Sequence, residues 1–231
     1  MAMFGTAAFF DLRNRSVSDL LWIVFGAAAG MIYLFNFPSF NDGILDLISI
    51  ALAGAIAFGI YKSGLFGGAD ALALFTFSVI LPVYGNTEGA VLTRVTAFHP
   101  IAPLIVLTNA AILSVSQVGF NLIRNLVYHR KHPHKLFEGF QHETAARKML
   151  AVLVGHRSEK TPQYAFAIEK TTEGRKQFDF ALEAAETAEY ESRQDVWITP
   201  GIPFIVYLFA GFVAMILVGD LMAIAFGFAS R

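Results

Sequence analysis

The sequence of 231 residues contains no cysteine and little charge. The absence of cysteine excludes disulfides, zinc–thiolate sites, iron–sulfur clusters and a cysteine nucleophile. Charged residues make up 15% of the chain and hydrophobic residues 55%, whereas an ordinary soluble domain has about 25% charged residues. This composition excludes a disordered chain, a collagen and a coiled coil, and it disfavours a water-soluble globule. The formal net charge of -1 provides no basic surplus for binding nucleic acid.

The few charges that are present are unevenly distributed along the chain. Residues 129–199 carry 11 of the 17 Lys and Arg, 11 of the 18 Asp and Glu, and five of the six His. Such a division predicts a membrane protein that carries one soluble insert. We expect residues 1–128 to form transmembrane helices 1–5, residues 129–199 to form a cytoplasmic insert, and residues 200–231 to form transmembrane helix 6.

The expected fold class is therefore an all-α polytopic membrane protein of six transmembrane helices, with a small cytoplasmic α+β insert between helices 5 and 6. Five apolar runs approach or exceed the roughly 20 residues that span a bilayer core of about 30 Å: Leu20–Phe37, Ile44–Tyr61, Gly64–Tyr84, Pro100–Tyr128 and Ile202–Phe228. The run before Asp11 is shorter. It is either the end of a longer first span or a short, tilted helix, and it lacks the basic start of a cleavable signal peptide.

The positions of Lys and Arg predict the orientation of these spans. With six spans, 15 of the 17 basic residues fall on one side of the membrane, and only Arg94 and Arg231 fall on the other. Because basic residues accumulate in cytoplasmic loops, the first side is expected to be cytoplasmic. The insert lies on that side, and the N-terminus faces outward.

The insert shows local signs of folding. Apolar residues alternate on both sides of a turn at Thr171–Gly174, which predicts a hairpin, and the apolar stretch Lys148–Val154 is expected to pack on it. His129, His132 and His134 lie among basic residues at its start. A juxtamembrane basic patch that contacts anionic lipid is favoured there over a metal site.

Several polar residues interrupt the apolar runs. Asn109, Gln117 and Asn121 recur at nearly helical spacing and are expected to form hydrogen bonds between helices. Asp220, in the last apolar run, is expected to have a structural role. Asp19, with Ser18, is expected to cap the helix that follows.

Two aspartates stand at the ends of apolar runs. Asp11 follows one run and Asp70 opens another, with two expected spans between them. Since the chain crosses the membrane twice between them, both carboxylates are expected on the cytoplasmic side at the membrane boundary. Either one alone could be a helix cap, but an ionisable pair on one face indicates a function. Gly67, Gly68 and Ala69 are expected to bind substrate, because the small side chains before Asp70 let a backbone come close.

Two neighbouring carboxyls can hydrolyse a peptide without a metal or a cofactor. Like charges close together cannot both ionise, so the pair holds one proton and titrates as a unit. The ionised member takes a proton from water, and the protonated member donates to the scissile carbonyl.

The segments around both aspartates resemble those of the type IV prepilin peptidases, which are aspartyl proteases of the GxGD type. Residues 11–22 (DLRNRSVSDLLW) resemble the first aspartate segment, and residues 67–70 (GGAD) resemble the second in a looser form, with alanine at position 69. Residues 196–203 (VWITPGIP) and the apolar run after them resemble the C-terminal part of archaeal preflagellin (archaellin) peptidases. The resemblance implies an aspartic endopeptidase that cleaves the short basic leader from archaellin or type IV pilin-like precursors, with Asp11 and Asp70 as its catalytic residues.

The alternative function is an ion or proton-coupled membrane transporter that uses Asp11 and Asp70. Transporters usually place such carboxylates near the bilayer midplane among broken helices, whereas both aspartates here are expected at helix ends. A membrane-anchored scaffold is a third possibility, and it leaves the GGAD segment unexplained. For the peptidase, the expected partners are precursor proteins and membrane lipids, without nucleic acid. The expected location is the cell membrane, multi-pass, with the active site on the cytoplasmic side.

Overall fold

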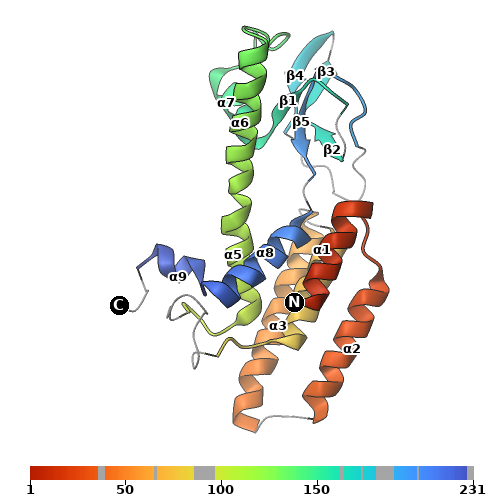
Figure 1. Ribbon diagram of the computed structural model, residues 1–231, viewed down its shortest axis with the longest axis vertical. Coiled ribbons are helices and arrows are strands. Elements are labelled where there is room, and N and C mark those ends of the chain that lie inside the picture. Colours follow the sequence, from red (N-terminus) through yellow and green to blue (C-terminus); the bar gives the residue numbers. More distant parts are fainter. Residues whose placement is uncertain are drawn as a thin grey trace. The chain divides into compact units, whose positions relative to one another are not determined.

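The computed structural model describes residues 1–35, 40–64, 67–85, 97–161, 164–172, 174–180, 190–201 and 203–227 (Figure 1). The chain divides into two compact units. The first unit consists of Met1–Ser114 and Pro203–Arg231, and the second unit consists of Val115–Ile202. The domain limits at 128/129 and 199/200 that composition indicates stay a prediction.

The expected fold class of six transmembrane helices in an all-α protein is wrong. Within the ranges that the structure describes, two helices are long and apolar enough to cross a membrane, Gly43–Lys62 and Ala102–Lys131. The second unit also contains β-sheets, so the fold as a whole is not all-α.

The error arises because the length of an apolar run does not show whether the run forms one helix. A transmembrane helix needs about 20 consecutive helical residues. The run 64–84 forms only a 13-residue helix, since Gly64 has a left-handed φ of 67° and Pro82 follows the helix end. The last run is broken at Gly219, whose φ is 97°. It therefore forms one helix of 14 residues and one of five.

The first unit is helical. Its elements are α1 (Ala2–Asn14), α2 (Asp19–Phe35), α3 (Phe40–Lys62), α4 (Gly68–Ile80), α5 (Ala102–Ser114), α8 (Phe204–Leu217) and α9 (Leu221–Ala225). The rings of Phe4 on α1, Phe77 on α4 and Phe212 on α8 lie 5.2–5.6 Å apart, centroid to centroid. These buried rings join three helices that are distant in sequence.

Helices α5 and α8 approach each other closely at Gly211. A Cβ at this position would lie 2.6 Å from the carbonyl oxygen of Val106 and 2.7 Å from the amide nitrogen of Ala110. Both neighbours are backbone atoms, so only glycine allows this separation. Asn109 fastens the same contact, because its side-chain amide donates to the carbonyls of Gly211 and Gly219 at 3.3 and 2.9 Å.

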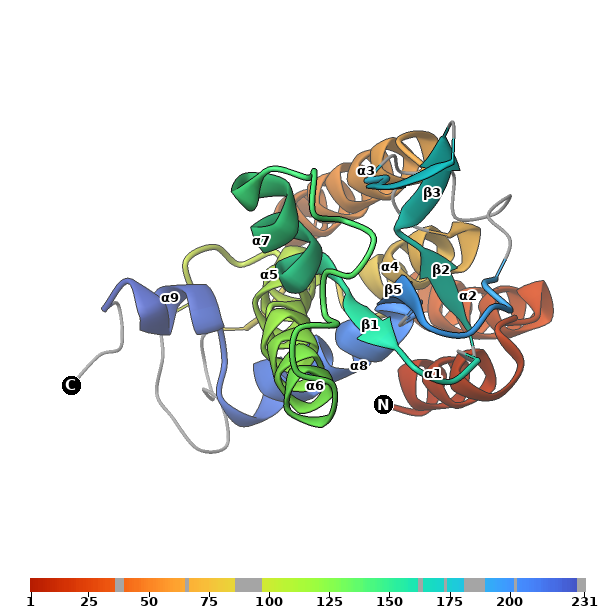
Figure 2. The ribbon, with the colours of Figure 1, turned by 90° about the horizontal axis from the view of Figure 1, so that it is seen from above.

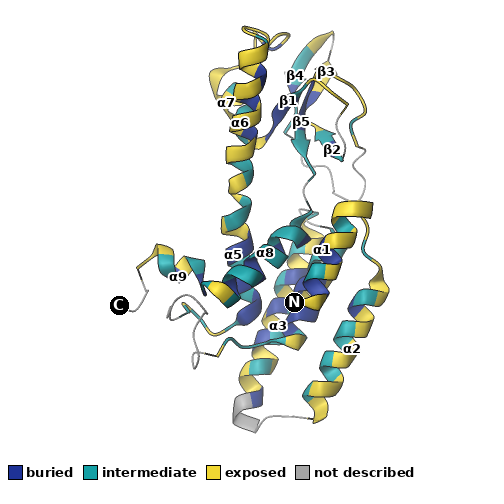
Figure 3. Ribbon diagram, viewed as in Figure 1, coloured by how far each residue is buried: buried dark blue, intermediate teal, exposed yellow. Residues whose placement is uncertain are grey.

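Many residues of α2 and α3 are exposed (Figure 3), and most of these residues are apolar. On α2, for example, Leu20 is 64% exposed, Leu34 75% and Phe35 87%. Soluble monomers rarely expose contiguous apolar patches above a few hundred Å². These exposed residues and the two long apolar helices are consistent with a membrane protein.

The second unit combines helices and sheets (Figure 2). Strands β1, β5 and β2 form one antiparallel sheet in that order, and β3 and β4 form another. The elements are α6 (Ser116–Lys131), α7 (Ala145–Val154), β1 (His156–Ser158), β2 (Ala165–Ala167), β3 (Glu169–Thr172), β4 (Arg175–Phe178) and β5 (Val196–Pro200).

The predicted hairpin is confirmed as the β3–β4 pair, in which Thr172 opposes Arg175. Residue 173 of its turn lies outside the described residues. The alternating residues expected before the turn, Tyr164, Phe166 and Ile168, lie in and beside β2 rather than in β3, and β2 pairs with β5. Helix α7 packs on the hairpin as expected, since Ala151 shares a buried cluster with Phe178 and Trp197.

The polar residues of the apolar runs mostly have the expected structural roles. Asn109 and Asn121 each bond the backbone of another segment, and Gln117 instead donates to Asn121 within α6. Asp220 is 1% exposed and caps α9, accepting from the amides of Met222 and Ala223. The hydroxyl of Ser18 accepts from Leu20 in the first turn of α2.

Candidate active site

Asp11 lies near the C-terminal end of α1 and is half-buried. Its carbonyl accepts the amide of Arg15 at 3.0 Å, and Arg15 ends the helix with a left-handed φ of 56°. Burial raises the pKa of the Asp11 carboxyl, and the Arg15 cation that this turn holds nearby opposes that rise.

Asp70 lies in the first turn of α4. Its Oδ2 accepts the backbone N–H of the N-cap residue Gly67 at 3.2 Å, at the start of the helix. The carboxylate also accepts the backbone N–H of Ile205, in the first turn of α8. The positive ends of two helix dipoles therefore meet at Asp70, and both favour an anion there.

The aromatic contact between α1 and α4 sets the relation between the two aspartates. Phe4 precedes Asp11 by seven residues, and Phe77 follows Asp70 by seven residues. Seven residues are nearly two helical turns, or about 10.5 Å. Since the Phe4 and Phe77 rings lie 5.2 Å apart, antiparallel α1 and α4 would bring the two carboxylates to the same end of the helix pair. The effect of the Asp11 charge on the pKa of Asp70 agrees with this arrangement.

The charge of Asp11 influences the protonation of Asp70. Burial first, and then the charge of Asp11, raises the pKa of Asp70 to about 7, against the hydrogen bonds from Gly67 and Ile205. Burial also raises the pKa of Asp11, against the opposing charge of Arg15. The pair therefore keeps a proton at pH values where an exposed carboxyl, with a pKa near 4, has lost it.

The residues before Asp70 leave one side of its carboxylate uncovered. Gly67 has φ -69° and ψ 159°, a conformation that any residue adopts. A Cβ at Gly67 would lie 3.8 Å from Asp70 Oδ2, which is ordinary van der Waals contact. Neither backbone strain nor a clash within the chain requires glycine there. Gly68 and Ala69 continue this small surface into the first turn of α4.

An apolar pocket adjoins Asp70. Helices α3, α4, α5 and α8 all contribute to its walls, and Asp70 is its one charged residue among those that the structure describes. The apolar walls include Ile60, Ala71, Leu74, Leu107, Phe204 and Leu208. The Asp70 carboxyl, whose pKa is raised, thus borders a surface of apolar side chains.

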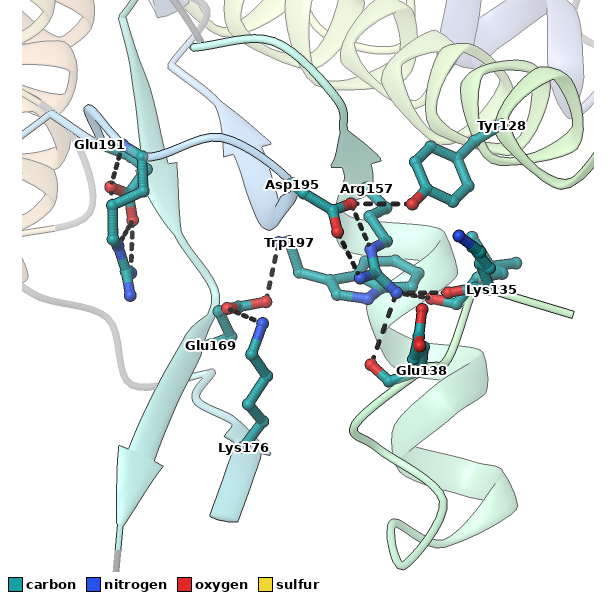
Figure 4. Close-up of polar contacts among 11 residues, drawn as sticks. Tyr128, Lys135, Glu138, Arg157, Glu169, Lys176, Glu191, Asp195 and Trp197 are labelled. Carbon is teal, nitrogen blue, oxygen red and sulfur yellow. Dashed lines mark hydrogen bonds and ion pairs between the residues drawn. The ribbon is translucent and has the colours of Figure 1, made fainter. Parts of the chain in front are cut away.

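The second unit contains a polar centre that the sequence analysis did not detect (Figure 4). Arg157 is 5% exposed and forms a bidentate ion pair with Asp195, with Nε–Oδ1 and Nη2–Oδ2 distances of 2.9 and 2.8 Å. Its Nη1 also donates to the carbonyls of Lys135 and Leu136. The hydroxyl of Tyr128 donates to Asp195 at 2.8 Å. These contacts tie four separate segments together.

The protonation of Asp195 follows from this centre. Burial acts to raise its pKa, but hydrogen bonds from Arg157 and Tyr128, together with the Arg157 charge, hold the pKa below its ordinary value. Asp195 stays ionised and balances the buried guanidinium. Its left-handed φ of 53° is a further cost that the contacts offset.

The histidine cluster at 129–134 has salt-bridge partners of its own. His132 Nε2 lies 3.2 Å from Glu159 Oε1, and Lys131 Nζ lies 3.7 Å from the same oxygen. In the described part of the chain, no three His, Asp or Glu side chains gather as a metal-binding group. The lipid-contacting basic patch stays a prediction.

Comparisons with known proteins show what this chain is similar to. Residues 136–221 match the family model described as Archaeal Peptidase A24 C-terminus Type II, which indicates a peptidase. The chain is also 22% identical over 227 residues to the preflagellin peptidase of Methanocaldococcus jannaschii, covering 93% of this chain and 89% of that protein. The resemblance to the archaeal preflagellin peptidase family is confirmed.

Proposed function

We propose that this chain is a membrane-embedded aspartic endopeptidase that removes the short basic leader from archaellin or type IV pilin-like precursors. Asp11 and Asp70 are its catalytic pair. The observation that supports this proposal is the raised pKa of the half-buried Asp70, to which the charge of Asp11 contributes, together with the Phe4–Phe77 contact between the helices that carry the two aspartates. The similarity to peptidases along the chain supports it over transport by the same two aspartates.

The proposed reaction is direct attack of water on the scissile carbonyl. The oxygen of water bonds to the carbonyl carbon while the ionised carboxylate accepts a proton from that water. The protonated partner donates its proton to the carbonyl oxygen. Collapse of the tetrahedral intermediate breaks the C–N bond. The leaving amine takes a proton from the pair, and a hydroxyl of the intermediate returns one to the pair as the new carboxyl group forms. The raised pKa of Asp70 suits this role, because the pair must hold one proton near neutral pH.

Gly67, Gly68 and Ala69 form the proposed approach for the substrate backbone. The scissile stretch must be extended, because a helical carbonyl is hydrogen-bonded and shielded. A backbone that passes over Gly67 meets no side chain from that residue and comes close to Asp70 Oδ2.

The proposed active site lies on the cytoplasmic side of the membrane. Both long apolar helices end in basic residues, Lys62 on α3 and His129, Arg130 and Lys131 on α6. Such ends favour the cytoplasmic face. Asp70 follows Lys62 after a short connection, at the level where the basic leader of a precursor would meet its apolar segment.

The proposed activity is tested by incubating the purified full chain, in detergent micelles, with synthetic peptides. Each peptide carries a basic leader followed by an apolar segment, and mass spectrometry identifies the products. We expect one cut at the junction of leader and apolar segment. Peptides that stay intact under conditions where the protein is folded would contradict the proposal.

Replacing Gly67 by alanine is expected to lower kcat/KM by about 10- to 100-fold, because a small displacement of the scissile carbonyl has effects of that size. The added methyl lies 3.8 Å from Asp70 Oδ2, on the side that the substrate backbone needs. The free energy of unfolding should change by less than about 1 kcal/mol, as the backbone conformation suits alanine.

Gly59→Ala is the matched control for this substitution. Gly59 is an exposed glycine of α3, and a Cβ there would have no neighbour within 4 Å. Its kcat/KM should equal that of the unchanged protein. Full activity of the Gly67→Ala protein would show that the substrate does not approach over Gly67.

A further inference from the structure

We infer that the outward face of α7 lies in the headgroup region of an anionic lipid leaflet, so that the second unit binds the membrane surface through this helix. The inference is independent of the proposed function. It concerns a helix of the second unit that lies outside both candidate membrane spans.

Helix α7 turns its apolar side outward. The apolar side chains recur at intervals of three and four residues and therefore share one face of the helix: Ala146, Met149, Leu150, Leu153 and Val154. Met149 is 65% exposed, Leu150 41% and Val154 37%, whereas Ala151, on the opposite side, is fully buried. The helix thus packs on its own unit through another side, and its apolar face stays available for an apolar environment.

Helix α6, which packs against α7, has the same inverted arrangement. Asn121 and Asn125 are buried, and their side chains donate to the carbonyls of Leu153 and Gly155 at 3.0 and 2.8 Å. The large apolar residues of the helix are instead exposed: Phe120, Leu122, Ile123, Leu126 and Val127. A water-soluble helix buries its apolar face and exposes its polar one. The reversed order is what contact with lipid requires.

The length of the candidate span that contains α6 indicates where α7 meets the membrane. The helix Ala102–Lys131 has 30 residues, whereas about 20 residues cross a bilayer core. Its last turn is basic, which places this end on the headgroup side. The twentieth residue of the span is Asn121, which bonds Leu153 near the end of α7. That end of α7 is therefore held where the hydrocarbon gives way to headgroups.

Charge distinguishes a lipid leaflet from other occupants of this face. Helices α6 and α7 carry five Lys or Arg residues and no Asp or Glu: Arg124, Arg130, Lys131, Arg147 and Lys148. Only Arg147 and Lys131 form ion pairs within the described residues, with Glu143 and Glu159. A second copy of this chain would bring like charges together across a symmetric contact, and a basic leader would be repelled. Anionic headgroups attract these side chains while the apolar face enters the leaflet.

The test measures the depth of a single nitroxide label on the full chain in nanodiscs that hold one chain each. Because the chain has no cysteine, Met149→Cys supplies one attachment site, and Thr171→Cys, an exposed position on β3, is the matched control. Oxygen concentrates in lipid and a nickel chelate stays in water. In discs that contain phosphatidylglycerol, we expect the label at position 149 to collide mainly with oxygen and the label at position 171 mainly with the chelate.

The charge dependence of the same signal tests the choice of lipid. Discs of phosphatidylcholine alone should lower the oxygen preference at position 149. Arg130→Gln should lower the ratio of docked to free label by about fivefold, the usual contribution of one basic residue at an anionic surface. Lys170→Gln, a substitution of an exposed lysine on β3, should leave the ratio unchanged.

Three results would overturn the inference: equal collision ratios at positions 149 and 171, a label at position 149 that prefers the chelate, or an oxygen preference that is the same in both kinds of disc. Val154→Cys repeats the measurement if the Met149→Cys protein does not fold. Cleavage of leader peptides by the same samples tests the proposed function separately, so either idea can fail while the other stands.

Discussion

Asparagine at Asp11 or at Asp70 is expected to reduce leader cleavage by at least about 10²- to 10⁴-fold, the contribution usually made by a positioned acid or base. Asparagine keeps the size of the side chain but neither takes a proton from water nor donates a carboxyl proton. The two single substitutions should have similar effects, and the double substitution should add little, because the pair acts as a unit. Precursor processing in cells and peptide cleavage in micelles both measure the loss.

Asp19→Asn is the matched control for these substitutions. Asp19 is an exposed carboxylate in the first turn of α2, eight residues after Asp11. Its loss removes a helix-dipole contact of less than about 1 kcal/mol and should leave the cleavage rate nearly unchanged. Cleavage that survives at either catalytic position, at normal protein levels, would refute the assignment of that aspartate.

The second large effect concerns stability rather than catalysis. Arg157→Met is expected to lower the free energy of unfolding of the second unit by about 3–5 kcal/mol, as typically happens when one partner of a buried ion pair is removed. The carboxylate of Asp195 and the carbonyls of Lys135 and Leu136 would all lose a donor. Arg157→Lys should be intermediate, because lysine keeps the charge but cannot form the bidentate contact.

Chemical denaturation of the full chain in micelles measures this effect. Trp197 is buried in the core of the second unit and reports its unfolding, once Trp22→Phe has removed the other tryptophan. Lys170→Met is the control, since its ion pair with Asp179 is solvent-exposed and should contribute about 1 kcal/mol or less. Equal midpoints for the Arg157→Met and Lys170→Met proteins would contradict the structural role of Arg157.

Local sequence patterns predicted several parts of the fold correctly. The β3–β4 hairpin, the packing of α7 and the hydrogen bonds of Asn109 each follow from a few neighbouring residues. The number of membrane spans did not follow in the same way. A hydropathy profile does not register the left-handed backbone conformation of a glycine such as Gly219, whereas the helix ends there.

The contacts that position the two aspartates lay beyond these patterns. The Ile205 amide that bonds Asp70 belongs to a backbone position 135 residues away, which no side-chain motif marks. Phe4 and Asp11 are as far apart in sequence as Asp70 and Phe77. This equal spacing could have predicted that the two aspartates lie close together, since antiparallel helices that meet at the two Phe rings bring the two Asp residues to the same level. Arg157 and Asp195, 38 residues apart, offered none, because only the tertiary fold makes them partners.

The most direct test of the account is a cross-link between positions 11 and 70. Because the chain has no cysteine, Asp11→Cys with Asp70→Cys introduces a single pair of thiols, and a short bifunctional thiol reagent reports their proximity. We predict a cross-link between these positions and none for Asp46→Cys with Asp70→Cys. Asp46 lies 11 residues, or about 16 Å, along α3 from Ala57, which borders Asp70. No cross-link between positions 11 and 70 in folded protein, or equal cross-linking of both pairs, would contradict the shared site.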